Sequence, residues 1–278
     1  MGFKLFLIAL VSIAAVAFAA RLPNSNPGTF IIGGENATKN EFPWLVRFTV
    51  LPASGESRFC LGTLVDLNLV LTSASCVTGN SRPITVVAGD HLLLEDEGTE
   101  QSVASSEVFL HENFNKTGGL ENDIAFIRLS STLEETESVS AIELPKPNYD
   151  PVYYGFGIGA GWGETNETEL SPILQRAWVD IREKERCGEH GFQIPEGQFC
   201  TIDEIGAYSG DTGGPLSCYG TPGKICGILS STAAHEGTIM GSYTNVSQYL
   251  DWIGGYANST RGHFQIKPLQ TIVLPQDV

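Results

Sequence analysis

Short apolar or alternating segments recur along most of the chain. Gly, Pro, Asn and Ser separate them, which is typical of antiparallel strands joined by hairpins. The segments fall into two groups, of which the first comprises 45–50, 62–67, 70–73, 84–88 and 123–129. The second group comprises 157–163, 175–181, 215–218, 226–230 and 241–245. This pattern predicts an all-β protein.

One segment after the last strand has helical spacing. Residues 246–256 place Val246, Tyr249, Leu250 and Ile253 on one face, as an amphipathic helix requires. No other segment has this spacing, so we expect a single helix. The chain has 278 residues, 42% hydrophobic and 17% charged, which is enough for one large domain or two small lobes with a packed core.

The first twenty residues differ from the rest of the chain. After Lys4 they are almost without polar side chains, and small residues flank Phe18 in a pattern typical of signal-peptide cleavage. A membrane anchor is the alternative, but the apolar run is short for a bilayer span. We therefore expect residues 1–19 to be a secretory signal peptide. Residues 20–30 follow as a short, polar, propeptide-like segment.

The chain is strongly acidic. It carries 16 Lys and Arg residues against 32 Asp and Glu residues, a formal net charge of −16. Nucleic acid and anionic membrane surfaces are therefore not expected as partners. Secretion allows the six cysteines to be interpreted as disulfides. Five glycosylation sequons agree with a secreted glycoprotein, and they stand at Asn36, Asn115, Asn166, Asn245 and Asn258.

Short motifs carry the candidate chemistry. Segment 210–215 reads Gly-Asp-Thr-Gly-Gly-Pro, and glycines at that density let backbone N–H groups converge on one point. Segment 71–76 reads Leu-Thr-Ser-Ala-Ser-Cys, segment 122–125 reads Asn-Asp-Ile-Ala, and segment 31–34 reads Ile-Ile-Gly-Gly. These motifs resemble the nucleophile loop, the histidine loop, the aspartate motif and the mature N-terminus of the chymotrypsin-like serine proteases.

The resemblance implies a fold and a division of the chain. Members of that family have two six-stranded antiparallel β-barrels packed side by side and a C-terminal helix, which agrees with the two groups of strands. We expect the serine protease-like domain to cover residues 31–260. Residues 261–278 depart from the family pattern as a C-terminal tail, either extended along the body or disordered.

The catalytic positions of the family are changed in this chain. Ser75 stands where the family has its histidine and Thr212 where it has its serine, whereas Asp123 keeps the carboxylate. A hydroxyl at position 75 has no useful basicity near neutral pH and cannot replace an imidazole. The resemblance places no other histidine where it would act as the base; the chain contains His91, His111, His190, His235 and His263.

The remaining machinery is interpreted as structural. The backbone N–H groups of Gly210 and Thr212 keep the positions of the family's oxyanion-hole donors. Asp123 is buried in the family, and a buried carboxylate needs hydrogen-bond donors. We therefore expect Ser75 and Ser230 to donate their hydroxyl groups to Asp123, as a remnant of the catalytic site.

The specificity pocket also departs from the trypsin-like pattern. Gly206 stands six residues before the nucleophile position, where a trypsin-like enzyme has aspartate. Thr232 replaces a glycine and is expected to narrow the pocket mouth, and Ser231 removes an apolar platform. An active protease with a preference for small residues is the alternative. It is disfavoured because no change in the pocket restores a general base.

The resemblance further implies a maturation step and three disulfides. In the family, cleavage frees an amine that pairs with the aspartate before the nucleophile, and the matching residues here are Ile31 and Asp211. Phe30 precedes that point, so a trypsin-like activator would not cut there. The implied disulfides are Cys60–Cys76 and Cys187–Cys200, which leaves Cys218–Cys226 as a hairpin staple.

One acidic loop resembles the calcium loop of trypsin-like members. The side chains of Asp90, Glu97 and Glu100, with the carbonyls of Leu92 and Glu95, would offer the oxygen ligands that Ca²⁺ prefers. A solvated acidic loop is the alternative. No cofactor is required for the expected function, and calcium is the candidate ion.

Binding without cleavage is the function expected from these features. A secreted, inactive serine protease homologue would engage a protease, a zymogen or an inhibitor in an extracellular proteolytic or immune-type cascade, since a fold does not determine activity. Two alternatives stay open. The first is a weakly active serine-type peptidase, and the second is a secreted decoy or effector that binds a host or microbial molecule.

Overall fold

The computed structural model of the chain describes residues 34–257, apart from 54, 81, 116, 164–168, 205, 207–209, 220–222 and 236. The predicted signal peptide, propeptide-like segment and C-terminal tail lie outside the described residues, as do Ile31, Asn166 and Asn258. Within the described part of the chain, no helix is long and apolar enough to cross a membrane.

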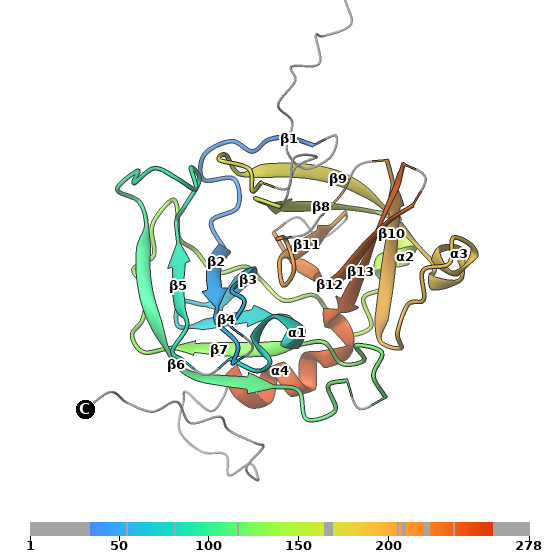
Figure 1. Cartoon of the computed structure of the whole chain (residues 1–278), viewed down its shortest axis with the longest axis horizontal. Coiled ribbons are helices and arrows are strands. Elements are labelled where there is room, and N and C mark those ends of the chain that lie inside the picture. The colour runs from blue at the N-terminus through green and yellow to red at the C-terminus, as the bar shows by residue number, and fades with distance from the viewer. Residues whose placement is uncertain are drawn as a thin grey trace, which may run out of the picture.

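Two antiparallel β-barrels lie side by side (Figure 1). The first is closed, with its strands in the order β2-β3-β4-β7-β6-β5. Its strands are β2 (Leu45–Val50), β3 (Arg58–Asp66), β4 (Leu69–Thr72), β5 (Thr85–Ala88), β6 (Gln101–Leu110) and β7 (Ala125–Leu129).

The second barrel has its strands in the order β9-β10-β13-β12-β11-β8, and pairing between β8 and β9 closes it. The short strand β1 (Glu35–Asn36) extends this sheet beside β9. The barrel strands are β8 (Phe156–Gly161), β9 (Gln175–Arg182), β10 (Gln198–Asp203), β11 (Pro215–Cys218), β12 (Ile225–His235) and β13 (Thr238–Asn245). The predicted fold class is confirmed.

Apolar side chains that strand alternation turns inward fill the barrels. In β2, Val46, Phe48 and Val50 are buried, whereas Thr49 between them is exposed. Complete burial of one such side chain contributes about 1.5–3 kcal/mol to the free energy of folding. A further cluster joins the barrels to the C-terminal helix, where the rings of Phe126 and Trp252 stack with their centroids 5.2 Å apart.

The C-terminal helix has two parts, the 3₁₀ turn η1 (Val246–Tyr249) and α4 (Leu250–Ala257). The prediction of a single helix is wrong, because the described residues contain three more short helices. These are α1 (Ala74–Val77), α2 (Pro151–Tyr154) and α3 (Lys184–Glu189). A helix of one or two turns is too short to show a 3.6-residue period in the sequence.

The sequence pattern missed two barrel strands, β6 and β10. Both bury polar side chains, which interrupt an apolar alternation. Ser105 of β6 is buried, and its Oγ accepts a hydrogen bond of 2.9 Å from the Ile84 N–H. In β10, Gln198 and Thr201 are buried. β12 also continues to His235, beyond its predicted end at residue 230.

Three disulfides join the predicted cysteine pairs, Cys60–Cys76, Cys187–Cys200 and Cys218–Cys226, and no described cysteine is free. The first attaches β3 to α1 and contributes about 3 kcal/mol in the chain-entropy model. It therefore fixes one wall of the cleft between the barrels.

Candidate functional site

A cleft of about 580 Å³ lies between the two barrels. Strands β2 and β3 and helix α1 supply one wall, and the 210–212 turn and β12 supply the other. The cleft brings together Ser75, Gly210, Thr212 and Ser230, as the sequence predicts. Ser75 and Thr212, which the sequence analysis matched to two of the family's catalytic positions, therefore share one site.

Asp123 is completely buried beside the cleft and caps helix α1. The first N–H groups of a helix have no partner within that helix, and Ser73 at the N-cap position provides no side-chain bond. Asp123 supplies the missing acceptor: its Oδ1 accepts a 2.7 Å hydrogen bond from the Ser75 N–H. The Ser75 hydroxyl donates to Asp123 Oδ2 at 2.8 Å.

A second hydroxyl reaches the same carboxylate from the other barrel. Ser230 Oγ donates to Asp123 Oδ2 at 2.5 Å, and Gln198 Nε2 donates to Ser230 Oγ at 3.2 Å. Burial raises the pKa of Asp123, and the hydrogen bonds from Ser230 and Ser75 offset part of that rise. Both predicted hydroxyl donors are confirmed, and both carboxylate oxygens are occupied by structural hydrogen bonds.

Thr212 lies on a tight turn that depends on Gly213. The φ angle of Gly213 is +84°, and a Cβ there would lie 2.3 Å from the Leu61 carbonyl oxygen, so no other residue fits. The Leu61 N–H donates to the Thr212 carbonyl at 2.9 Å, which joins the turn to β3. Among the described residues, the Thr212 hydroxyl and the Gly210 N–H have no hydrogen-bond partner, so both are available to a molecule in the cleft.

Comparison with known proteins agrees with this architecture. The family model described as Trypsin matches residues 31–253 of the chain. The protein belongs to the trypsin-like serine protease family. Trypsin-1 of Astacus astacus is 33% identical over 236 residues, which cover 80% of this chain and 98% of that protein. Coagulation factor IX of Oryctolagus cuniculus is 33% identical over 244 residues, covering 84% of this chain and 86% of that protein.

A solved structure of this trypsin-like fold, described as GrC, superposes on the chain with a TM-score of 0.72 and 28% sequence identity. The match covers 82% of this chain and 100% of that one. The two-barrel domain is thus the part that this chain shares with its family.

No histidine is among the described residues that line the cleft of this trypsin-like protein. His91 lies between β5 and β6, and the ring of His111 lies 5.2 Å from that of Trp252. His190 follows α3 as its C-cap, and His235 is the last residue of β12. His263 lies outside the described residues.

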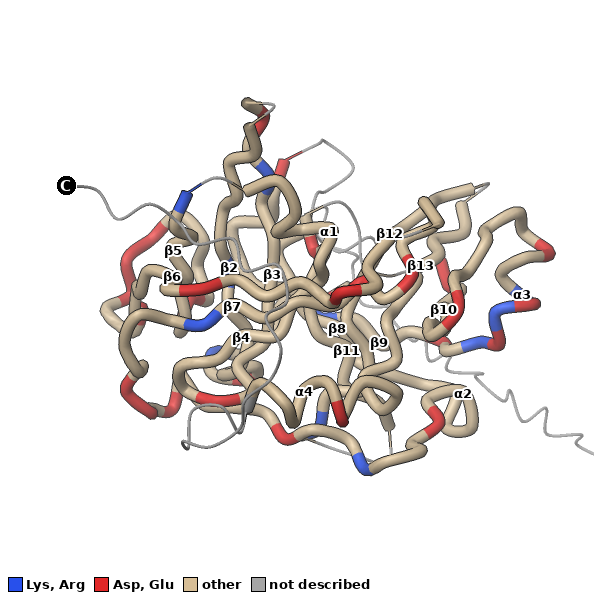
Figure 2. Tube along the Cα trace, turned by 90° about the horizontal axis from the view of Figure 1, so that it is seen from below, with Lys and Arg blue, Asp and Glu red and all other residues tan. Residues whose placement is uncertain are grey.

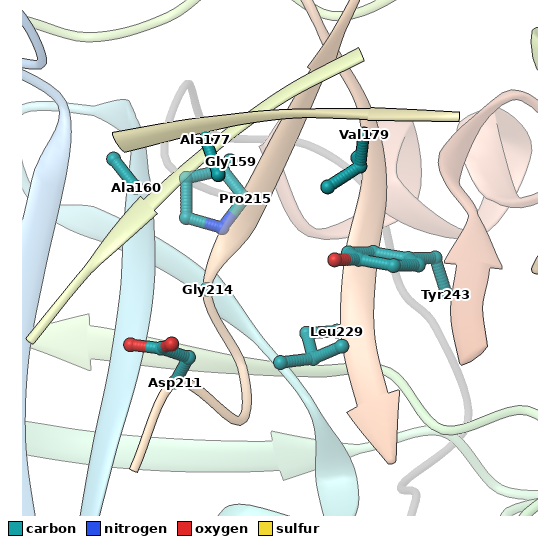
Figure 3. A pocket seen from close by; sticks show the side chains of 9 residues that line it. All are labelled: Gly159, Ala160, Ala177, Val179, Asp211, Gly214, Pro215, Leu229 and Tyr243. Carbon is teal, nitrogen blue, oxygen red and sulfur yellow. The ribbon is translucent and has the colours of Figure 1, made fainter. Parts of the chain in front are cut away.

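Asp211, the predicted partner of the mature N-terminus, is buried in the second barrel (Figure 3). It accepts a 2.7 Å hydrogen bond from the Gly163 N–H. Beside it is a space of about 10 Å³, lined in part by Pro215 and Tyr243 and large enough for about one water molecule. Because Ile31 lies outside the described residues, its pairing with Asp211 stays a prediction.

The three predicted specificity residues, Gly206, Ser231 and Thr232, are not among the described residues that line this cleft, and their role in a specificity pocket stays a prediction. Gly206 is buried, and a Cβ on it would lie 3.4 Å from Ile239 and 3.8 Å from Val179, so its surroundings are apolar. Ser231 and Thr232 continue β12 and pair with β13. The narrowed pocket mouth stays a prediction.

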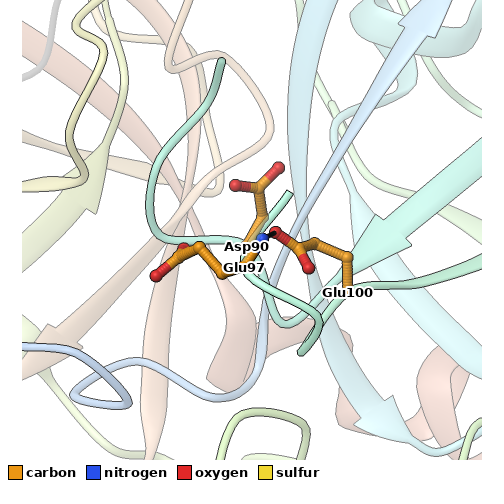
Figure 4. Close-up of side chains that lie close together, drawn as sticks. All are labelled: Asp90, Glu97 and Glu100. Carbon is orange, nitrogen blue, oxygen red and sulfur yellow. Dashed lines mark hydrogen bonds between the residues drawn. The ribbon is translucent and has the colours of Figure 1, made fainter. Parts of the chain in front are cut away.

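The predicted calcium ligands do lie together. Carboxylate oxygens of Asp90, Glu97 and Glu100 lie within 4.8 Å of one another (Figure 4). Two cations face these three carboxylates: Arg47 pairs with Asp90, and Lys39 Nζ lies 2.9 Å from Glu97 Oε1. The fixed cations therefore neutralise part of the negative charge.

One oxygen of this acidic cluster is unsatisfied. Asp90 Oδ1 is buried without a hydrogen-bond partner, and burial raises the pKa of this carboxyl group. A cation bound there would satisfy the buried oxygen, and an all-oxygen donor set suits Ca²⁺. The carbonyl of Leu92 accepts a 2.9 Å turn hydrogen bond from the Glu95 N–H and retains a second lone pair. These residues fit a weak calcium site.

The described sequons differ in exposure. Asn36 and Asn115 are exposed, so either position has room for a glycan. Asn245 is only 8% exposed, and its Oδ1 accepts hydrogen bonds from the N–H and hydroxyl of Ser247. A glycan must stand at the surface, so the burial of Asn245 disfavours this sequon, and glycosylation itself stays a prediction.

Two residues of the site escaped the sequence analysis. Gln198, in the unpredicted strand β10, orients Ser230. Arg58 lines the cleft and donates from Nη1 to the Ser75 carbonyl at 2.9 Å. A signal for Arg58 existed: it stands two residues before Cys60, whose disulfide attaches β3 to the helix that carries Ser75.

Proposed function

We propose that this member of the trypsin-like family is a secreted, catalytically inactive homologue that acts by binding. The role of Ser75 carries the proposal. It occupies the family's base position, and its hydroxyl donates to Asp123 at 2.8 Å. A hydroxyl has no useful basicity near neutral pH, so it cannot take a proton from Thr212.

Thr212 alone does not restore the chemistry. Triad members act as a unit, and an enzyme without them keeps only about 10³–10⁴-fold acceleration over water from oxyanion stabilisation and binding. The scaffold around the site is well maintained, with the Gly213 turn, the buried Asp211 and three disulfides. These features favour a protein that keeps its fold for binding.

The expected setting is extracellular. Three disulfides favour an oxidising compartment. We expect the protein to bind a protease, a zymogen or an inhibitor in a proteolytic or immune-type cascade, with no nucleic-acid partner and no membrane anchor. The relative named coagulation factor IX is consistent with such a setting.

Labelling by a fluorophosphonate probe tests the loss of catalysis. The wild-type protein, beginning at Ile31, should stay unlabelled, and Thr212→Ser alone should do no better because the new hydroxyl still lacks a base. The double variant Ser75→His with Thr212→Ser rebuilds the triad and should be labelled. Peptide turnover should stay poor until Thr232→Gly is added, because Thr232 is expected to narrow the specificity pocket. Labelling should depend less on this change, because the probe makes little use of that pocket.

The controls separate the alternatives. Active trypsin confirms the probe, and melting temperatures confirm that each variant is folded. Labelling of the wild type at Thr212 would support the weakly active peptidase and overturn the proposal. A folded double variant without label would mean that the oxyanion-hole donors are not in place. Affinity capture from the native fluid distinguishes a cascade partner from a microbial or host molecule bound by a decoy.

A further inference from the structure

The cleft contains a single charged side chain among the described residues that line it, and that side chain is Arg58. The two cysteines that line the cleft form a disulfide, and the other described residues that line it are neutral. Elsewhere acidic residues are spread over both barrels of a chain with a net charge of −16 (Figure 2). Arg58 is therefore the one cation that faces this cleft among the described residues of an acidic protein.

Arg58 has no carboxylate within ion-pair distance among the described residues. Most other described cations are paired: Lys39, Arg47, Arg128, Arg176, Arg182, Lys184, Arg186 and Lys224 each contact an acidic residue. Arg82 and Lys146 also have no such contact, but both are exposed and neither lines the cleft. An unpaired cation held in a concave site favours an anionic ligand.

Two backbone carbonyls hold the guanidinium in place. Nη1 donates to the Ser75 carbonyl at 2.9 Å, and Nη2 donates to the Thr78 carbonyl at 2.7 Å. A guanidinium has five N–H groups, so each terminal nitrogen keeps one more donor. Nε is buried and does not face solvent. Each terminal nitrogen therefore has one N–H group left for a carboxylate oxygen, and charge-assisted bonds of this kind are strong.

The neighbouring groups suit the rest of a peptide. The Gly210 N–H and the Thr212 hydroxyl have no described hydrogen-bond partner and line the same cleft, so they are available to a peptide carbonyl. The Asp123 carboxylate does not line the cleft, and hydrogen bonds from Ser75 and Ser230 engage both of its oxygens.

We infer that the cleft binds extended peptides that carry a carboxylate, and that Arg58 is the residue that selects them. The carboxylate belongs to an Asp or Glu side chain or to a peptide C-terminus, and it pairs with the terminal nitrogens of Arg58. The inference rests on the proposed function, since a ligand held there must not be cleaved. It adds the class of partner, an acidic protein segment.

Binding to a peptide array tests the inference. The array uses a six-residue Gly/Ala host with both ends blocked, in which each position in turn is Glu, Gln or Lys. The full-length protein should bind at least one Glu peptide about tenfold more tightly than its Gln counterpart at about 50 mM salt, and Lys peptides least. The preference should shrink at about 500 mM salt. A second arm compares the all-Gly/Ala peptide with a free and with an amidated C-terminus, and so distinguishes the two sources of carboxylate.

Arg58→Gln should abolish the discrimination between Glu and Gln peptides, whereas Arg82→Gln removes the same charge outside the cleft and should leave it unchanged. Arg58→Lys should retain only part of the preference, because an ammonium has a single nitrogen where the guanidinium has two terminal nitrogens. Equal binding of acidic and neutral peptides by the wild type would overturn the inference, as would the absence of any binding or an unchanged preference in Arg58→Gln. The wild-type comparison stands even if Arg58→Gln fails to fold.

The two proposals fail in different ways. If the fluorophosphonate probe labels the wild type, the proposed function fails whatever the array shows. If the probe does not label it and the array shows no preference for acidic peptides, the protein is an inactive homologue and the inference about Arg58 alone is wrong.

Discussion

The carboxylate of Asp123 holds Ser75 by two hydrogen bonds, one of 2.7 Å from its N–H and one of 2.8 Å from its hydroxyl. In a trypsin-like protease this carboxylate orients the catalytic base. Here it caps helix α1 and joins the barrels through Ser230. The carboxylate at the family's catalytic position thus takes part in the structural framework of this protein.

Replacing Asp123 should reveal this structural role. Asp123→Ala leaves the donors on Ser75 and Ser230 without their acceptor in a dry environment, so we expect a loss of about 3 kcal/mol in the free energy of unfolding. Asp123→Asn keeps an acceptor for the Ser75 N–H and should cost much less. Urea denaturation of the two variants measures both effects. An unchanged midpoint in Asp123→Ala would contradict the structural role.

The wild type and Asp123→Asn should differ in how their stability depends on pH. The pKa of Asp123 is raised in the folded state. The folded protein therefore keeps this proton more tightly than the unfolded chain, and stability is lost as the pH rises through the folded pKa. Asp123→Asn should remove that loss, so the difference in unfolding free energy between this variant and the wild type should shift in favour of Asn as the pH rises above about 4, the pKa of an unfolded Asp. Parallel stability curves would rule out a raised pKa.

Calcium should stabilise the protein modestly. Asp90 Oδ1 is buried without a partner beside Glu97 and Glu100, and a cation bound only by the folded state raises the melting temperature by mass action. We expect a higher melting temperature in about 5 mM calcium than in chelator, and no response in Asp90→Asn. Magnesium is the matched control because it prefers a smaller, octahedral site. An identical melting temperature in calcium and chelator would remove the site.

Gly163 should not tolerate a side chain. A Cβ there would lie 2.2 Å from Oδ2 of the buried Asp211, which also accepts the Gly163 N–H hydrogen bond. We expect Gly163→Ala to destabilise the protein by about 1–3 kcal/mol. Gly188→Ala is the control: it lies within helix α3, a Cβ there meets nothing within 4 Å, and alanine favours a helix. Equal melting temperatures for the two variants would show that Asp211 moves freely.

Asn245 should carry no glycan, whereas Asn36 and Asn115 are exposed acceptors. Mass spectrometry of peptides from protein secreted by eukaryotic cells should find glycan at Asn36 or Asn115 and unmodified Asn245. Asn245→Ala should cost about 1 kcal/mol of stability through loss of the cap on η1. Glycan found on Asn245 would mean that this turn is open in the secreted protein.

Local patterns in the sequence predicted much of the architecture. The alternation in β2 indicates which face of the strand is buried, because successive side chains point to opposite faces. It failed for β6, where the buried Ser105 takes an apolar position because its hydroxyl accepts a backbone hydrogen bond. The changed residues Ser75 and Thr212 were identified from position alone, since each lies inside a short motif.

By itself the sequence determined which chemical groups the site contains, and the tertiary structure decided what they contact. Ser75 and Asp123 are 48 residues apart, and Ser230 lies 107 residues beyond Asp123. No local pattern encodes such pairs, because they depend on how two separately closed barrels pack together. The position of Arg58 in the cleft has the same origin: the sequence shows a cation near Cys60, but the disulfide to Cys76 and the packing of the barrels make it the charged group of the site.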